Sequence, residues 1–553
     1  MIRELMSVAA ICVCAVLYAT AAADTQTSSV TPSRRTAHTD SSMFAPASDC
    51  LACHNRLVAP NGEDVSIGAA WRGTVMANAA RDPYVQASIR RETIDHPMRA
   101  DDIEDECAAC HMPAAQKIAR AAGSKGKIFA HLSSRAVGTG SGLDGLAIDG
   151  VSCTVCHQIA PDRLGTSDTI NGNFVVAPPL DAGKRRAFGP FEPDAGRRRI
   201  MHSVTGFEQA PATHVRESEL CATCHTLVTE AFGPDGRVIG SLPEQMTYEE
   251  WRHSTFAREQ RSCQSCHMPP VKGPVRVASV LGDFRESLSR HTFLGGNAFI
   301  LRMMNRYRDE IGVEATPGEL ESVARATILQ LERETAAIEI DQVTLTQGML
   351  AVDVVVKNLT GHKFPTGYPS RRAWLHLRVN DSAGRLVFES GRLTETGTID
   401  GNLSDADDGA YEPHFEVISQ RDQVQIYESI MGTPAGLPTT GLRQATQYLK
   451  DNRLAPRGFD KGVASPSIAV IGNAAGDADF AGESDRVRYQ IPFNGSAAAT
   501  VDVELLYQSI GARWAQNLAP FKVPEAVRFV RYYNSLASTS AVVIARTVRT
   551  IAQ

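Results

Sequence analysis

The spacing of hydrophobic residues changes twice along the chain and divides it into three parts. From residue 46 to about residue 300 the apolar residues keep no sustained period, and Pro and Gly interrupt the sequence throughout. Between residues 301 and 336 apolar residues recur three and four positions apart, as on one face of a helix. From residue 337 onwards short runs alternate between apolar and polar residues, which is typical of strands. We therefore expect a mainly helical or irregular part, a helical connector and a strand-rich part.

The connector contains the clearest helix start in the sequence. Thr316 and Glu319 form a predicted capping box, and Pro317 stands at the first helical position, where proline is favoured. The apolar face then continues through Leu320, Val323, Ile328 and Leu331. This pattern predicts a helix that runs to about Ala336.

The alternating segments predict a β-sandwich-like region with loop insertions at residues 337–553. Two adjacent runs flank a turn at Gln347 and Gly348, and another turn falls at 380–384. The predicted strands cover residues 338–345, 350–356, 375–379, 386–388, 501–505 and 542–545. The stretch from about 404 to 485 is rich in loops, and the pattern gives no order of strands there.

The N-terminus has the three features of a secretory signal peptide: a positive residue, a short apolar run and a small-residue cleavage site. These are Arg3, residues 6–18 and the alanines at 21–23, so residues 1–23 are expected to be removed. A membrane anchor is the alternative, but the run is too short to span a bilayer. Residues 24–45 are rich in Ser, Thr and Pro, and we expect a disordered lead-in. The mature protein is expected to be periplasmic or otherwise secreted, with no transmembrane anchor.

Charge and length narrow the classes of function. The chain carries a formal charge of −6 and has 553 residues, enough for two or more domains. A negatively charged chain is a poor match to nucleic acid, so no nucleic-acid partner is expected. Two basic runs, 184–186 and 197–199, are either partners for the carboxylates of a cofactor or solvated loops.

One pentapeptide, Cys-x-x-Cys-His, occurs five times between residues 50 and 267. It is the attachment signature of c-type haem: two thiols bind the vinyl groups of the porphyrin, and the adjacent His ligates the iron. The cysteine pairs are Cys50 and Cys53, Cys107 and Cys110, Cys153 and Cys156, Cys221 and Cys224, and Cys263 and Cys266. The proximal histidines are His54, His111, His157, His225 and His267. Five copies in one chain are far above chance and predict five covalently bound haem c groups.

Other cysteine chemistry fits the pattern less well. A zinc ribbon pairs two Cys-x-x-Cys units at short spacing, and a disulfide framework needs no following His. The chain has twelve cysteines, of which Cys12 and Cys14 lie in the predicted signal peptide. The other ten all belong to the five motifs, so no thiol is left for an iron–sulfur cluster or a nucleophile.

The first part is expected to be a pentahaem cytochrome domain at residues 46–300. Such a stretch leaves little room for protein cores between five cofactors, so the haems themselves should form much of the core. Proline follows two motifs, at Pro113 and Pro269, and is expected to end the helix that carries the proximal His. The fold class expected for the whole chain is α+β: a mainly α or irregular multihaem cytochrome domain wrapped around five haems, followed by a β-sandwich-like domain.

Each haem iron has a second axial position, which a side chain either fills or leaves open. Ten histidines lie outside the motifs, enough for bis-His ligation of all five haems. The candidate distal ligands are His362, His291, His214, His253, His131, His96 and His202. For each the alternative is a surface His or one that bonds a propionate. His38 lies in the lead-in and is a poor candidate, and Met76 is expected to pack rather than to ligate.

His362 lies in the most constrained segment of the strand-rich part. Gly361, Pro365, Gly367 and Pro369 surround it and predict a rigid loop that leaves a strand. We expect this loop to insert His362 into the haem domain as a distal ligand. The alternative is a capping His in a turn.

The five motifs, together with Gly-His-Lys-Phe-Pro-Thr-Gly at 361–367 and Tyr-Pro-Ser-Arg-Arg-Ala-Trp-Leu-His at 368–376, give the chain a family resemblance. It resembles the secreted bacterial multihaem c-type cytochromes, and its haem half is more loosely similar to the tetrahaem cytochromes that serve hydroxylamine oxidoreductase. This resemblance implies periplasmic electron transfer, mostly low-spin bis-His haems, and His362 as a haem ligand. The chain departs from the enzymes of that wider group, because it has five motifs rather than eight and no Cys-x-x-Cys-Lys variant.

Two functions fit these observations. The favoured one is an electron carrier between redox partner proteins, in which electrons pass along closely packed haems. The alternative is an oxidoreductase in which one haem keeps an open distal site for a small nitrogen or sulfur compound, with His376 and His414 as candidate acid–base groups. The β-sandwich-like region is a candidate docking module for a partner. Its acidic residues Asp405, Asp407 and Asp408 form either a calcium site or an acidic loop.

Overall fold

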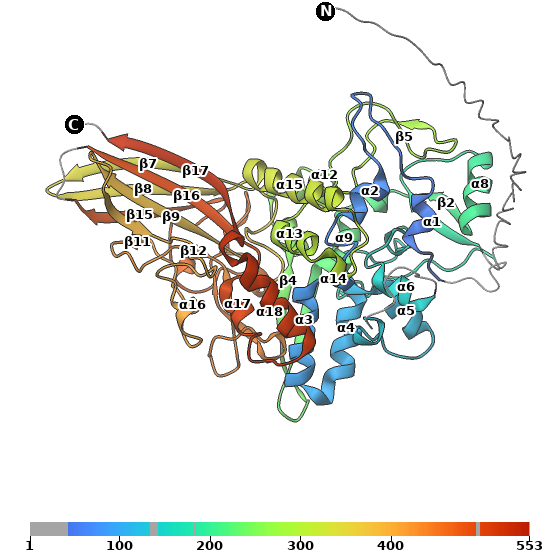
Figure 1. The fold of residues 1–553 in the computed structure, drawn as a ribbon, viewed down its shortest axis with the longest axis horizontal. Helices are drawn as coiled ribbons and strands as arrows, with labels where there is room; N and C mark the ends of the chain where they lie inside the picture. The colour runs from blue at the N-terminus through green and yellow to red at the C-terminus, as the bar shows by residue number, and fades with distance from the viewer. Residues whose placement is uncertain (1–42, 133–141, 182–183, 494–497, 552–553) are drawn as a thin grey trace, which may run out of the picture.

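Strands gather at one end of the molecule and short helices at the other (Figure 1). The computed structural model describes residues 43–132, 142–181, 184–493 and 498–551. The predicted signal peptide, most of the predicted lead-in and His38 lie outside these residues. Where the description begins, Phe44 is completely buried, so the last residues of the expected lead-in are packed rather than disordered. In the described part of the chain, no helix is both long and apolar enough to cross a membrane.

The part that precedes the connector consists of short helices joined by long loops. Its hydrophobic residues form several small clusters instead of one core. Its α-helices are α1 (Ala47–Leu51), α2 (Ile67–Arg72), α3 (Pro83–Asp95), α4 (Ala100–His111), α5 (Pro113–Ala121), α6 (Leu143–Ile148), α7 (Cys153–Cys156), α8 (Ala195–Thr205), α9 (Ser218–His225), α10 (Thr247–Arg252), α11 (Thr255–Arg258) and α12 (Cys263–His267). As expected for helices followed by Met-Pro, α4 ends at His111 and α12 ends at His267.

Three small two-stranded sheets complete this part. Strands β1 (Arg185–Gly189) and β2 (Phe207–Pro211) pair in parallel. Strands β3 (Thr226–Phe232) and β4 (Val238–Met246) form an antiparallel hairpin directly after α9, and β5 (Val275–Arg276) pairs with β6 (Phe284–Arg285). The hairpin places β4 beside the end of the fourth motif.

The connector contains α13 (Ala298–Arg306), α14 (Arg308–Ile311) and α15 (Pro317–Glu334). The predicted capping box of α15 is confirmed, because the Thr316 hydroxyl accepts from the Glu319 N–H and the Glu319 carboxylate accepts from the Thr316 N–H. The Glu319 carboxylate also pairs with Arg72 on α2, which fixes the connector against the first part. Helix α15 leads almost directly into the first strand of the next region.

Within the described residues, the strand-rich region contains two large sheets and one small two-stranded sheet. One large sheet has the order β10-β9-β16-β17 with β12 paired to β9, and the other large sheet has the order β11-β15-β8-β7. The strands are β7 (Ala336–Thr346), β8 (Met349–Asn358), β9 (Arg372–Asp381), β10 (Leu386–Ser390), β11 (Val417–Ile418), β12 (Ile426–Tyr427), β15 (Ser484–Pro492), β16 (Ala499–Gln508) and β17 (Ala541–Ile551). All six predicted strands are present, and Gln347 and Gly348 form the β7–β8 turn at φ 50° and 77°.

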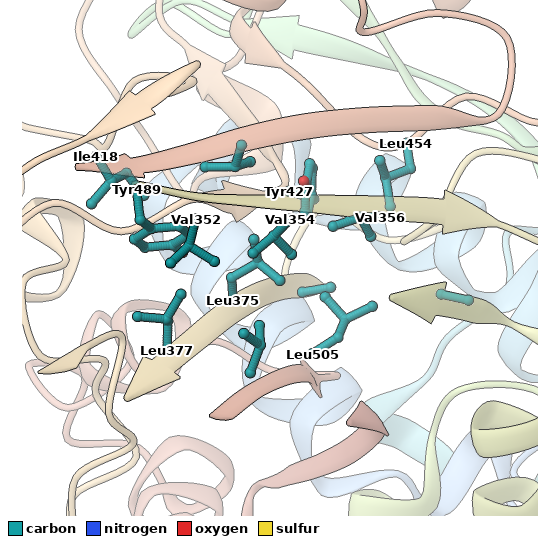
Figure 2. Packing of buried hydrophobic residues seen from close by; sticks show 14 of the residues in the cluster. Val352, Val354, Val356, Leu375, Leu377, Ile418, Tyr427, Leu454, Tyr489 and Leu505 are labelled. Carbon is teal, nitrogen blue, oxygen red and sulfur yellow. The ribbon is translucent and has the colours of Figure 1, made fainter. Parts of the chain in front are cut away.

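One hydrophobic core lies between the two large sheets, which confirms the sandwich pattern. Val352, Val354 and Val356 of β8 face Leu375 and Leu377 of β9, and all five side chains are completely buried (Figure 2). Burying one such side chain contributes about 1.5–3 kcal/mol. Alternation on both sheets therefore explains why this region folds as a sandwich.

The segment that the pattern left unordered contains very short strands. Besides β11 and β12, these are β13 (Ser429–Gly432) and β14 (Gln447–Asp451), which are too short to show a period of two. Two further helices, α17 (Ala512–Gln516) and α18 (Pro524–Leu536), follow the late strand β16. Helix α18 packs on α3, so the C-terminal part returns to cover the helical part.

Candidate haem sites

Each of the five Cys-x-x-Cys-His motifs lies on or next to a short helix: α1, α4, α7, α9 or α12. A helical turn places residues i, i+3 and i+4 on one face, so each motif presents two thiols and one imidazole together. All fifteen of these residues line one cavity of about 1340 Å³. A pocket for one small molecule measures about 300–1,000 Å³, so this cavity is larger than a single-ligand site.

The proximal histidines are oriented by the backbone. In four motifs the Nδ1 atom lies within hydrogen-bond distance of a carbonyl oxygen, to which an Nδ1–H donates, and this leaves Nε2 free to ligate. The pairs are His54 with Val277 at 2.8 Å, His111 with Ala79 at 3.3 Å, His157 with Phe188 at 2.5 Å, and His267 with Leu294. An Nδ1–H hydrogen bond of this kind fixes the ring and the tautomer of a metal-ligating His.

Two non-motif histidines stand opposite proximal ones across the cavity. The ring centres of His267 and His362 are 6.2 Å apart with planes at 15°, and those of His157 and His291 are 6.4 Å apart at 19°. Metal–nitrogen bonds of about 2.0–2.1 Å, with each ring centre roughly 1.1 Å behind its nitrogen, put two axial imidazoles of one ion roughly 6.2–6.4 Å apart. Direct ring stacking would need a much closer approach. The two pairs therefore have the spacing of axial ligands on a shared iron.

The loop that carries His362 is anchored on both sides. The Asn358 side chain donates to the His362 carbonyl at 2.8 Å, and the buried Lys363 ammonium pairs with Asp451 at 2.8 Å. A side chain at Gly361 would lie 2.9 Å from the ring of Phe256 on α11, so only glycine lets the loop approach this closely. These contacts hold the imidazole of His362 over the fifth motif.

Both facing histidines are in the form that binds metals. Burial lowers the pKa of His291 and the pKa of His362 to about 4, so both imidazoles are neutral near pH 7. Their Nδ1 atoms face the carbonyls of Ser289 at 3.0 Å and Lys363 at 2.8 Å, which points Nε2 elsewhere. Neutral imidazole is the ligating species.

The other five predicted distal ligands do not line the cavity. The His214 Nε2–H donates to the Ile159 carbonyl at 2.8 Å, and His131 bonds Asp144 at 2.7 Å. His253 Nδ1 lies 2.8 Å from the Glu249 carbonyl. His96 is buried against Phe232, and His202 lies half-buried on α8. The structure does not bring these five together with a motif, and ligation by them stays a prediction.

The histidines considered for acid–base chemistry lie outside the cavity, which corrects that expectation. His376 stands on β9 between Glu389 at 3.0 Å and Glu504 at 3.1 Å. His414 is buried, with its Nε2 3.0 Å from Asp477. Both belong to ion-pair and hydrogen-bond networks of the strand-rich region.

The acidic loop is also engaged by protein groups. The Asp405 carboxylate accepts from both terminal nitrogens of Arg372, each at 2.9 Å, and Asp408 lies 3.7 Å from Arg513. These contacts fit the acidic-loop interpretation.

Cysteines of different motifs touch one another. The thiols of Cys50 and Cys153, of Cys110 and Cys224, and of Cys221 and Cys263 are close enough for each to shift the pKa of the other, and none of the ten described cysteines forms a disulfide. In the haem-loaded protein these atoms would be the thioether sulfurs. The contacts put the first motif beside the third, and the fourth beside the second and the fifth.

The backbone supports the same adjacency. Helix α1 packs on α7, and α9 packs on α12. The Cys263 N–H donates to the Ser218 hydroxyl at 3.1 Å, which joins the fifth motif to the start of α9. Gly172 donates to the Thr223 carbonyl at 2.7 Å and leaves no room for a side chain against Ala109, so it joins the second motif to the fourth.

Two charged residues of the cavity wall were not found from the sequence. Arg371 donates to the Thr366 carbonyl at 2.6 Å, and among the described residues it has no carboxylate ion pair. Glu244 on β4 is 4% exposed. In the sequence, Arg371 is marked only by the neighbouring Arg372, and Glu244 only by Pro243, which stands before it inside a strand.

Three comparisons with known proteins were made. No protein-family model matches the chain, and no curated protein matches it. A solved structure, the penta-heme cytochrome c552 from Thermochromatium tepidum, aligns with a TM-score of 0.49 and 16% sequence identity, over 92% of this chain and 100% of the other. A likeness at this level carries no argument about fold or function.

Proposed function

We propose that this protein is a periplasmic pentahaem c-type cytochrome that transfers electrons between redox partner proteins. The observation that carries the proposal is the geometry of the two imidazole pairs, His267 with His362 and His157 with His291, across a cavity lined by all five motifs. Haem supplies one-electron chemistry when it is bound. The ten cysteines would hold five haems covalently, and the motif histidines would be their proximal ligands.

The chain's residues would keep the cofactors in place and in contact. The paired imidazoles would hold an iron between them, and the haems of the third and fifth motifs would then have no distal position free for a substrate. Because cysteines of different motifs lie close together, the attachment edges of neighbouring haems would also be close, which would favour rapid electron transfer between them. Among the residues that the structure describes, the Arg371 guanidinium has no carboxylate partner, so it is suited to bind a haem propionate.

The alternative function, an oxidoreductase with an open-site haem, keeps one observation in its favour. Among the described residues, His291 and His362 are the two non-motif histidines that line the cavity. The first, second and fourth motifs therefore have no histidine opposite them in the cavity wall of the described structure. A small nitrogen or sulfur compound is the substrate class for such a site.

A haem count and an electron paramagnetic resonance (EPR) spectrum test both functions. The pyridine haemochrome assay should give five haems per chain, and intact-mass analysis should show them covalently attached. Fewer than five would refute the proposal. In the air-oxidised protein, the carrier function predicts only low-spin ferric haem, whereas a high-spin signal equal to one haem or more would favour the oxidoreductase.

A further inference from the structure

Glu244 is a buried carboxyl group that faces the cavity without a cationic partner. Its Oε1 accepts from the Gln245 side chain at 3.2 Å, while its Oε2 is buried and has no hydrogen-bond partner. Within the described residues, no Lys, Arg or His side chain forms an ion pair with it. Burial without such a pair disfavours the carboxylate, so the proton affinity of this carboxyl group is raised.

The backbone directs this side chain into the cavity. In the β3–β4 hairpin Leu227 pairs with Gln245 and Val228 pairs with Pro243, so Glu244 is the extra residue of a β-bulge. A bulge re-aims one side chain relative to the regular alternation of a strand, and bulges are frequent beside active sites. Pro243 has no N–H to donate, which fits an interruption of the ladder here.

Glu244 lies where the second and fourth motifs meet. Its charge acts on the thiols of both Cys107 and Cys110, and β3 begins directly after the fourth motif. Gly172 joins the same two motifs, because its N–H donates to the Thr223 carbonyl at 2.7 Å and its Cα packs against Ala109. A carboxyl group at this junction would be close to the attachment edges of the two haems that these motifs would hold.

The charged groups around Glu244 form their ion pairs and hydrogen bonds with other residues. Arg443 is the nearest cation, but its guanidinium pairs with Glu106 on α4 at 2.8 Å. The Glu92 carboxylate on α3 accepts from the N–H groups of Leu442 and Arg443 at 2.8 and 3.2 Å. The phenols of Tyr368, which precedes β9, and Tyr448 on β14 complete the set of titratable neighbours. One cation and two other carboxylates leave the surroundings negative, which further opposes ionisation of Glu244.

We propose that Glu244 is a proton acceptor coupled to reduction of the haem held by Cys107 and Cys110. One electron from a reduced redox partner protein converts that haem from ferric to ferrous, and Glu244 takes up one proton from solvent to become the neutral acid. The O–H bond of the carboxylic acid forms as the bond between the proton and its solvent donor, a hydronium ion, breaks, and reoxidation reverses both transfers. The added electron removes one positive charge nearby and so raises the proton affinity of the carboxylate. This inference rests on the proposed electron-transfer function and adds redox-linked proton uptake to it.

The expected size of the effect follows from the burial of Glu244. Burial is the main cause that raises the pKa of its carboxyl group to about 7, so it titrates near neutral pH. If reduction raises its proton affinity tenfold, the linked potential shifts by about 59 mV across the titration. At pH 7.5 the same change corresponds to an uptake of about half a proton per molecule.

Proton uptake on reduction is the measurement that tests this role. The five-haem holoprotein is reduced at an electrode in weakly buffered solution with a pH-indicator dye, for the wild type and for Glu244→Gln. The variant should take up about half a proton less than the wild type at pH 7.5, and Glu244→Asp should restore part of the difference. Equal proton uptake by the wild type and Glu244→Gln would overturn the inference. The haem propionates would then be the groups that accept the proton.

Glu412→Gln is the matched control. Glu412 is also buried, and burial likewise raises the pKa of its carboxyl group to about 7, but it lies outside the haem cavity. Its variant should leave the redox-linked uptake unchanged. If Glu412→Gln lost as much redox-linked proton uptake as Glu244→Gln, the inference would be overturned, because a buried carboxyl group outside the haem cavity would then have the same effect.

The wild type alone also tests the inference if Glu244→Gln fails to load its haems. Its redox-difference infrared spectrum should gain the C=O band of a protonated carboxylic acid on reduction near pH 7.5, and absence of that band would refute the role of Glu244. The haem count and the reducibility of each haem are measured in the same samples. Five reducible haems without the predicted uptake would refute only this inference, whereas fewer than five haems would refute the proposed function.

Discussion

Replacing His362 by alanine tests whether a side chain from the strand-rich region fills a haem ligand position. The ring of His362 lies 6.2 Å from that of His267 at 15°, so its removal should open one distal position. One iron in five should then change from low spin to high spin, while the other four remain as they were. Loss of a histidine that stabilises ferric iron should also raise the potential of that haem.

The structural cost of this change should be small. The Nδ1 atom of the imidazole lies 2.8 Å from the Lys363 carbonyl and 3.4 Å from the Thr360 hydroxyl, and losing a hydrogen bond of this kind costs about 0.5–1.5 kcal/mol. The loop itself is held by the Asn358 side chain on the His362 backbone and by the Lys363–Asp451 pair, which alanine leaves in place. The variant should therefore fold and keep five covalent haems.

The assay is low-temperature EPR of the air-oxidised protein, integrated for high-spin ferric haem. His376→Ala is the matched control, because His376 lies on β9 outside the cavity wall and its loss should leave the spectrum unchanged. Added imidazole should return the His362→Ala spectrum to low spin. A His362→Ala protein with five haems and no gain of high-spin signal would refute the reasoning from ring geometry.

Three further variants probe charge and packing. Asp485 is buried with a pKa raised to about 7, so the native state holds its proton more tightly than the unfolded chain, and wild-type stability should fall as pH rises towards 7. Asp485→Asn should remove this loss, so its free energy of unfolding should rise relative to that of the wild type by about 1.4 kcal/mol per pH unit between pH 5 and 7. Thermal unfolding at several pH values measures this difference, and a difference that does not change with pH would contradict the prediction. Arg371→Gln should lower the reduction potential of a neighbouring haem, measured by spectroelectrochemical titration. Arg325→Gln, on an exposed helix face, is the control and should leave the potentials unchanged. Equal changes of potential in the two variants would disprove pairing between Arg371 and a propionate. Leu375→Ala removes a completely buried side chain from the sandwich core and should cost about 2–5 kcal/mol, whereas a loss below 1 kcal/mol in thermal or urea unfolding would show a loosely packed core.

Interactions between residues that are close in the sequence could be predicted from the sequence alone. A haem motif spans five consecutive residues, so its two thiols and its imidazole share a helical face whatever the rest of the chain does. The capping box at Thr316 and the turn at Gln347 and Gly348 are likewise set by neighbouring residues, and both occur where the pattern predicts them. Alternation in long strands such as β8 and β9 also revealed the sandwich, because one face of each strand must be buried.

Contacts between residues that lie far apart along the chain are determined only by the tertiary structure. The sequence offered seven histidines for the distal positions, and the fold brings His291 and His362 opposite proximal rings while His214 is satisfied by a backbone carbonyl. The role of Glu244 depends on a bulge, on Arg443 being already paired, and on where two motifs meet. Distal ligation and buried charge depend on which surfaces pack together, and that is a property of the whole chain that no local spacing contains.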